Sequence, residues 1–160
     1  MALPTAIVIS VYLLLGLYYS KKQLSFLQNS LIFMIISIAA RNYTTIMSMQ
    51  LKWFHLTEDS LLFLVFLLHR DVIGPILVLI FINGYWTFHS GKMKVFLYII
   101  FLICLQLMDF FSVGFGVITY TKWSFLKAGL ANSAFLFAGL GLSKGILYFK
   151  RERSNYDNSI

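Results

Sequence analysis

The sequence predicts an all-α bundle of five membrane-spanning helices, and its composition is the first reason. Of the 160 residues, 59% are apolar and only 12% are charged, and the mean hydropathy is +0.81. Soluble domains contain about 45–50% apolar and about 25% charged residues, so this chain has too little charge to cover a surface that faces water. This composition excludes an ordinary soluble enzyme and a disordered chain. Its single cysteine, Cys104, excludes a module stapled by internal disulfides.

Five long apolar stretches are the second reason. A helix needs about 17–25 mostly apolar residues to cross the bilayer core. The predicted spans are about residues 2–19, 29–49, 60–88, 95–117 and 125–149, within a single transmembrane domain over residues 1–153 and before a polar tail over 154–160. The first stretch is predicted to be a retained span, because the basic pair Lys21 and Lys22 follows it, whereas a secretory signal has its basic residues before the apolar stretch.

The third stretch, residues 60–88, has an irregular centre. Polar residues 69–71 interrupt it, and the pair Gly74–Pro75 follows them. One interpretation is a single long helix that is kinked or broken near Gly74–Pro75, because proline lacks a backbone N–H and collides with the preceding turn. The other is a half-helix over 61–68 in the outer leaflet, followed by the true span over 72–88. The sequence leaves both open.

The positions of lysine and arginine predict the orientation. Cytoplasmic loops of membrane proteins collect these residues. With five crossings, one side of the membrane receives Lys21, Lys22, Lys92, Lys94, Lys150, Arg151 and Arg153, and the other receives Lys52, Lys122 and Lys127. We therefore expect the N-terminus outside and the C-terminus in the cytoplasm, with Trp53 and Trp123 as aromatic anchors at the outer interface. The same distribution explains the net charge of +7. The lipid bilayer is therefore the predicted partner, and no nucleic acid is.

Two charged residues within the predicted spans are the first candidates for a functional site. An ionisable side chain at a helix centre costs about 2.5–3.5 kcal/mol on insertion scales and faces the protein interior. Arg41 and Asp109 each lie eight residues before the predicted outer end of their span, which is about 12 Å at about 1.5 Å per residue. The sequence therefore predicts that they pair. Ser37 and Thr44 share the helix face of Arg41, and Gln106 shares that of Asp109.

An Arg41–Asp109 pair has two interpretations, and so have residues 69–71. The pair either lines a path for a solute or ion or locks two helices together, and the lock is favoured because a matched pair needs no substrate. His69, Arg70 and Asp71 form either a proton relay or anion site, or a polar turn, and the turn is favoured. Arg70 and Asp71 are not automatically a pair, because sequence neighbours point to different helix faces.

The fifth stretch carries a stripe of small residues that predicts a helix-packing face. These residues recur at steps of three or four: Ala131, Ala134, Ala138, Gly141 and Gly145. Small residues on one face allow helix backbones to approach closely, which is a main source of helix association in lipid. Packing within the chain is the plainer interpretation. A homo-oligomer or a membrane protein partner is the sharper one.

No catalytic residues, cofactor or metal are predicted. The histidines at 55, 69 and 89 have no metal-ligand spacing with Cys104, and no nucleophile elbow, phosphate-binding loop or paired-carboxylate site is present. The first hypothesis is a non-enzymatic membrane component that acts through helix packing with itself or a partner. The alternative is a small channel or carrier for an ion or polar solute that uses Arg41 and Asp109. An intramembrane enzyme ranks third.

The segment from Asp109 to Trp123 resembles a family of small, uncharacterised multi-spanning membrane proteins of spore-forming Firmicutes. In that family an acidic residue in a late span precedes a Gly-x-Ile-Thr-Tyr turn and a tryptophan. The matching residues here are Asp109, Gly116, Ile118, Thr119, Tyr120 and Trp123. The resemblance extends loosely over the latter two-thirds of the chain, and family members tend to have glutamate at the acidic position. It implies a location in a bacterial cell membrane and no particular activity.

Overall fold

A computed structural model describes the backbone of residues 2–20 and 23–157 and the side chains as far as 149, so the predicted basic pair Lys21 and Lys22 lies outside the described residues. Six α-helices, two π-helical segments and two short strands follow one another along the described part of the chain. They are α1 (Ala2–Tyr19), α2 (Phe26–Thr45), η1 (Ile46–Gln50), β1 (Phe54–Leu56), α3 (Ser60–Leu68), η2 (His69–Ile73), α4 (Gly74–Thr87), α5 (Gly91–Gly114), β2 (Ile118–Tyr120) and α6 (Phe125–Asp157).

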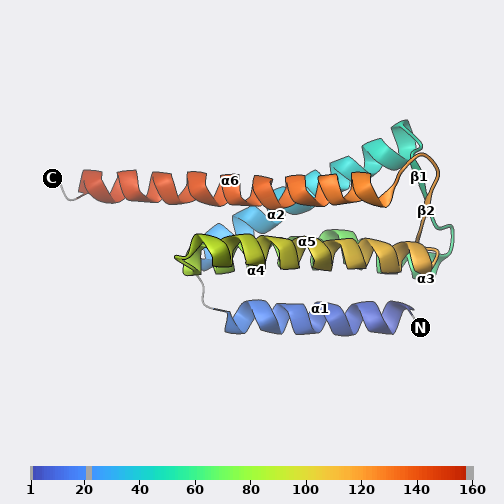
Figure 1. Cartoon of the computed structure of the whole chain (residues 1–160), viewed down its shortest axis with the longest axis horizontal. Coiled ribbons are helices and arrows are strands. Elements are labelled where there is room, and N and C mark those ends of the chain that lie inside the picture. The colour runs from blue at the N-terminus through green and yellow to red at the C-terminus, as the bar shows by residue number, and fades with distance from the viewer. Residues whose placement is uncertain (1, 21–22, 158–160) are drawn as a thin grey trace.

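The all-α fold class is confirmed. The described part of the chain contains five helices that are long and apolar enough to cross a membrane. They cover Ala2–Tyr19, Phe26–Gln50, Ser60–Thr87, Gly91–Gly114 and Phe125–Phe149. The two chain ends lie at opposite ends of the bundle, as an odd number of crossings requires (Figure 1). α6 continues to Asp157, into the segment predicted as a tail.

The third span is one continuous helix, so the half-helix interpretation is wrong. Asp59 caps its start, where the carboxylate accepts hydrogen bonds from two backbone N–H groups of the first turn at 2.8 and 3.0 Å. The irregularity at its centre is η2, in which the backbone N–H of Gly74 donates to the carbonyl of His69 five residues earlier. Pro75 then stands in the first turn of α4, where its missing N–H is tolerated.

This third span is the central element of the bundle. In an apolar stretch of 18 residues of this span 56% is buried, compared with 11–17% in the corresponding stretches of the other four spans. α4 packs against α1, α2, α5 and α6, and α1 and α6 lie on opposite sides of the layer formed by α4 and α5 (Figure 1). Gly139 lets α6 approach α4 closely, since an added Cβ would lie 2.7 Å from Val78 Cγ1 and 2.9 Å from Ile82 Cδ1.

A two-stranded antiparallel sheet, which the sequence did not predict, joins the loops after η1 and after α5. Its register pairs Phe54 with Tyr120 and Leu56 with Ile118. The sheet lies at the end of the bundle that carries the N-terminus (Figure 1). The carbonyl of Trp53 accepts hydrogen bonds from three successive N–H groups, residues 121–123, at 3.0–3.1 Å, which fastens the two loops to each other.

A buried amide pair fastens the opposite end. Asn83 is fully buried on α4, and its Nδ2 donates to Asn29 Oδ1 at 2.9 Å. Its Oδ1 accepts hydrogen bonds from the backbone N–H groups of Gln23 and Leu24 at 3.1 and 3.4 Å. The connection between α1 and α2 is thereby held against the central helix.

Candidate functional site

A cavity of about 120 Å³, with several polar side chains in a mainly apolar wall, lies in the half of the bundle that carries the sheet. Its polar lining comes from α2, η2, α5, β2 and α6, and consists of Tyr43, Thr44, His69, Arg70, Asp109, Tyr120 and Asn132. Its aromatic lining consists of Phe54, Phe66, Trp123 and Phe135. A single water requires about 10–15 Å³ by the same kind of measure, so this cavity has room for a small polar solute.

The cavity ends inside the bundle. On the central helix its lining reaches Val78 and goes no further toward the opposite end. One turn beyond, the side chains of Phe81 and Ile82 are fully buried, as is Leu136 on α6. Among the described residues, an apolar core therefore separates the cavity from the far end of the bundle.

The π segment η2 carries three polar residues, His69, Arg70 and Asp71. His69 Nδ1 lies 3.2 Å from Ser112 Oγ on α5. Arg70 lines the cavity, with its guanidinium 5.0 Å from the centre of the Phe66 ring. It also holds Asp71 through two contacts, Nε–Oδ1 at 2.8 Å and Nη2–Oδ2 at 2.9 Å. Arg70 and Asp71, whose pairing the sequence left open, do form a pair, because the arginine side chain is long enough to fold back to its neighbour's carboxylate.

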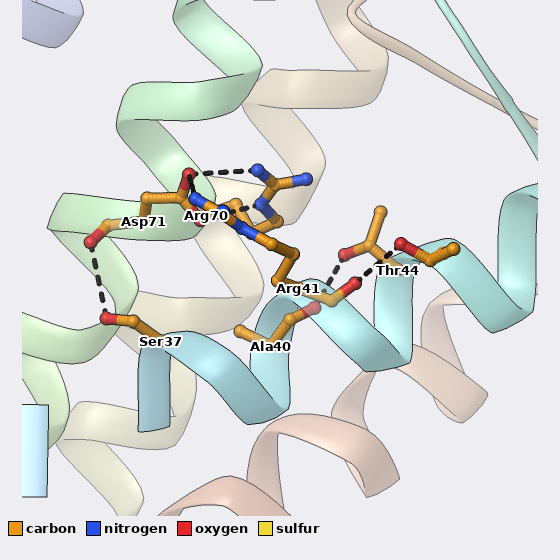
Figure 2. Close-up of polar contacts among 7 residues, drawn as sticks. Ser37, Ala40, Arg41, Thr44, Arg70 and Asp71 are labelled. Atoms are coloured by element: carbon orange, nitrogen blue, oxygen red, sulfur yellow. Dashed lines mark hydrogen bonds and ion pairs between the residues drawn. The ribbon is translucent and has the colours of Figure 1, made fainter. Parts of the chain in front are cut away.

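Arg41 pairs with Asp71, so the predicted Arg41–Asp109 pair is wrong. Arg41 Nη2 lies 3.0 Å from Asp71 Oδ2 (Figure 2). The depth match fails because α5 ends at Gly114, earlier than predicted, while η1 prolongs the helix of Arg41 to Gln50. Asp109 thus lies five residues from its helix end and Arg41 nine from Gln50. Ser37, on the same face as Arg41, donates to the Asp71 carbonyl at 3.5 Å (Figure 2).

Asp109 accepts a hydrogen bond from one amide side chain, that of Asn132, and pairs with no arginine among the described residues. Asn132 Nδ2 donates to Asp109 Oδ2 at 2.7 Å and lies 3.5 Å from Gln106 Oε1. Gln106 in turn donates to the carbonyl of Phe125 at 2.7 Å. Gln106 and Asp109 therefore share one helix face, as their spacing predicts. Within the described residues no cation lies within ion-pair distance of Asp109, and its second oxygen, Oδ1, has no hydrogen-bond donor there.

Tyr120, on the sheet, lines the cavity together with Asp109. Burial raises the pKa of the Tyr120 phenol, and the negative charge of Asp109 adds to this effect. Since the tyrosine stays protonated at neutral pH, it can donate a hydrogen bond to a group inside the cavity.

Aromatic rings at right angles form the wall next to the sheet. The ring centres of Tyr43 and Trp123 are 6.2 Å apart, and those of Tyr43 and Phe135 are 5.7 Å apart, with interplanar angles of 65° and 87°. Trp53 stacks on the outer side of Trp123 at 5.4 Å. The two tryptophans, predicted as separate interface anchors, are thus parts of one aromatic cluster with Lys127 Nζ 4.9 Å above the Trp53 ring.

The other predicted site residues lie outside this constellation or contribute little to it. Thr44 is buried on the cavity wall, but its hydroxyl donates to the Ala40 carbonyl of its own helix at 2.9 Å (Figure 2). The side chain of Arg41 is 65% exposed, against 13% for Arg70. Sequence reasoning missed Tyr43 and Asn132. Asn132 is a polar residue in an apolar span and could have been found by that signal.

The predicted packing stripe on α6 faces outward. Ala134, Ala138 and Gly141 are exposed, and Ala131 and Gly145 are half-buried. An added Cβ at Gly141 or Gly145 would meet no atom within 4 Å. Internal packing is therefore the wrong interpretation of this stripe, and Gly139, outside it, makes the close helix contact.

No group of three metal-ligating side chains that could hold a metal ion lies among the residues that the structure describes. Comparisons with protein-family models, with curated proteins and with solved structures find no match to this chain. The arrangement itself combines a carboxylate, a guanidinium, an imidazole and two phenols around a small cavity. A few polar groups that converge on an otherwise apolar wall are typical of small-molecule binding sites.

Proposed function

We propose that this protein is a small membrane carrier or receptor that binds a polar solute in the cavity at the sheet-bearing end. The observation that carries the proposal is the polar lining itself, which an otherwise apolar bundle gathers from four of its spans and the sheet. Ionisable groups are costly inside a membrane protein, and they mark substrate or ion pathways by default. Asp109 retains the role suggested by the sequence, while Arg70 takes the place of Arg41.

The closed inner end of the cavity favours a carrier or receptor over an open channel. A channel needs a continuous polar path, whereas Phe81 and Ile82 fill the bundle directly beyond Val78. Passage of a solute would require the helices to rearrange around the site, as alternating access does.

The proposed location is the cell membrane, with the N-terminus and the sheet outside and the C-terminus in the cytoplasm. The segments on the side of the membrane that carries the C-terminus contain more lysine and arginine than the segments on the other side, and this asymmetry supports the orientation. The resemblance of the segment from Asp109 to Trp123 supports a bacterial membrane. In this orientation the cavity lies in the half of the bundle that faces the outside of the cell.

Removal of the Asp109 charge tests the proposed binding function. The purified protein in detergent is heated with a panel of small cationic, anionic and neutral solutes, and its melting temperature is followed by tryptophan fluorescence. We expect at least one solute class to raise the melting temperature of the wild type, and Asp109→Asn to remove or reverse that selectivity. Glu58→Gln, which removes an exposed carboxylate outside the cavity, is the matched control. A panel with no stabilising solute contradicts the proposal.

A second candidate function, a component that acts through helix packing, is favoured by the outward-facing stripe on α6. Gly141→Leu fills the face formed by Ala134, Ala138 and Gly141 without a clash inside the chain, since a Cβ there meets nothing within 4 Å. We expect this variant to shift an oligomer toward the monomer in sedimentation equilibrium. Gly16→Leu on α1, equally open, is the control. An unchanged distribution between species in Gly141→Leu would rule this face out.

A further inference from the structure

We propose that the solute bound in the cavity is an organic cation with an ammonium group, held by Asp109 and the surrounding aromatic rings. The inference rests on the proposed binding function and names the class of solute. It starts from a difference between the two carboxylates inside the bundle. Asp71 is held by two arginines, whereas no cation among the described residues lies within ion-pair distance of Asp109.

The contacts of Asp109 leave one oxygen for a ligand. Oδ2 accepts the hydrogen bond from Asn132, and Asn132 is itself held by the Gln106 side chain. This chain fixes the carboxylate on the cavity wall. Oδ1 has no donor among the described residues, so an N–H group or a positive charge that enters the cavity has an acceptor already oriented for it.

The aromatic rings favour an organic cation over a hydrated metal ion. Tyr43, Trp123 and Phe135 present rings at steep angles to one another, and Phe54 continues the set with its ring centre 6.5 Å from that of Trp123. Ring faces carry negative charge density, and several rings around one space form the cage that recognises ammonium groups. Lys127 already places an ammonium against the outer side of this cluster, at Trp53.

The cationic groups of the lining do not make the cavity an anion site. The positive charge of Arg70 is offset at close range by Asp71, through contacts at 2.8 and 2.9 Å. His69 is engaged through Nδ1 with the hydroxyl of Ser112. The lining also includes Tyr43 and Tyr120, whose hydroxyls accept as well as donate hydrogen bonds.

The ammonium group could come from a free amine or from the headgroup of a lipid, because both present the same chemistry to the site. The experiment uses protein purified in dodecyl maltoside without phospholipid, titrated calorimetrically with tetramethylammonium chloride, methylammonium chloride, sodium acetate and sodium chloride. In a second arm, micelles contain phosphatidylcholine, which carries an ammonium, or phosphatidylglycerol, which does not.

We expect an ammonium salt to bind and acetate and sodium chloride not to bind. Asp109→Asn should weaken binding about tenfold or more, because a charged partner is lost, and Glu58→Gln should leave it unchanged. Phe135→Leu should weaken binding about fivefold through loss of one ring. Phe137→Leu, two residues along α6 and exposed outside the cavity, is the matched control. If phosphatidylcholine alone competes with tetramethylammonium, the lipid headgroup is a source of the ammonium.

Three results overturn the inference and differ in what they leave standing. If acetate binds and ammonium salts do not, the solute is not a cation, but the cavity is still a solute site. If ammonium binds to Asp109→Asn and Phe135→Leu as tightly as to the wild type, the cavity is not the site at which it binds. If neither ammonium salts nor either lipid binds, and no solute of the stabilisation panel acts, the proposed function falls together with the inference.

Discussion

Asp71→Leu is expected to lower the free energy of unfolding by about 3 kcal/mol, the lower end of the range for breaking one side of a buried ion pair. The lower end applies because the Asp71 side chain is still 22% exposed. The variant leaves Arg70, whose side chain is only 13% exposed, with its charge unpaired beside the Phe66 ring. It also leaves Arg41 without its partner. Urea or SDS titration of the protein in micelles, followed by tryptophan fluorescence, measures the change.

Arg41→Leu is the matched control for Asp71→Leu, because it removes the outer arginine and keeps the inner pair. The Arg41 side chain is 65% exposed, and exposed ion pairs contribute about 0–1 kcal/mol. The loss should therefore be about 1 kcal/mol or less. Equal losses in Arg41→Leu and Asp71→Leu would show that the outer contact, and not the buried Arg70–Asp71 pair, is the stabilising one.

The sequence predicted the spans because length and hydropathy determine which segments can cross a bilayer. It did not predict which charges meet, since that depends on where each helix ends to within one turn. An early end of α5 at Gly114 and a π extension of α2 to Gln50 were enough to separate Arg41 from Asp109 in depth. The resulting partner of Arg41, Asp71, lies in the segment for which the sequence left two structures open.

The sheet and the aromatic wall were outside the reach of sequence reasoning for a different reason. Strands of three residues have no readable alternation, and β1 and β2 pair across more than 60 residues of chain. Trp53 and Trp123 could be placed near the same membrane interface, but nothing in their own loops shows that they stack. The amides Asn83 and Asn132, in contrast, are recognisable in the sequence as polar residues inside apolar spans.

The position of Gly139 shows how packing at the centre of the bundle supports the cavity. Asn132 and Phe135 precede Gly139 by seven and four residues on α6, so the three share one helix face. Asn132 orients Asp109, and Phe135 forms part of the aromatic wall. The distance between α6 and the central helix therefore also sets the width of the cavity.

Gly139→Leu is expected to lower the free energy of unfolding by about 2–3 kcal/mol, toward the upper end of the usual overpacking range. The added Cβ alone would lie 2.7 Å from Val78 and 2.9 Å from Ile82, and these side chains are buried with little room to move. Because the clash pushes α6 away from the central helix, ammonium binding in the cavity should weaken in the same variant. Calorimetric titration and unfolding measured on one preparation test both effects. Gly141→Leu, two residues further on and open to its surroundings, should change neither the unfolding of the monomer nor binding. If the Gly139→Leu protein unfolds like the wild type but no longer binds ammonium, the substitution disturbs the cavity wall and not the packing at the centre of the bundle.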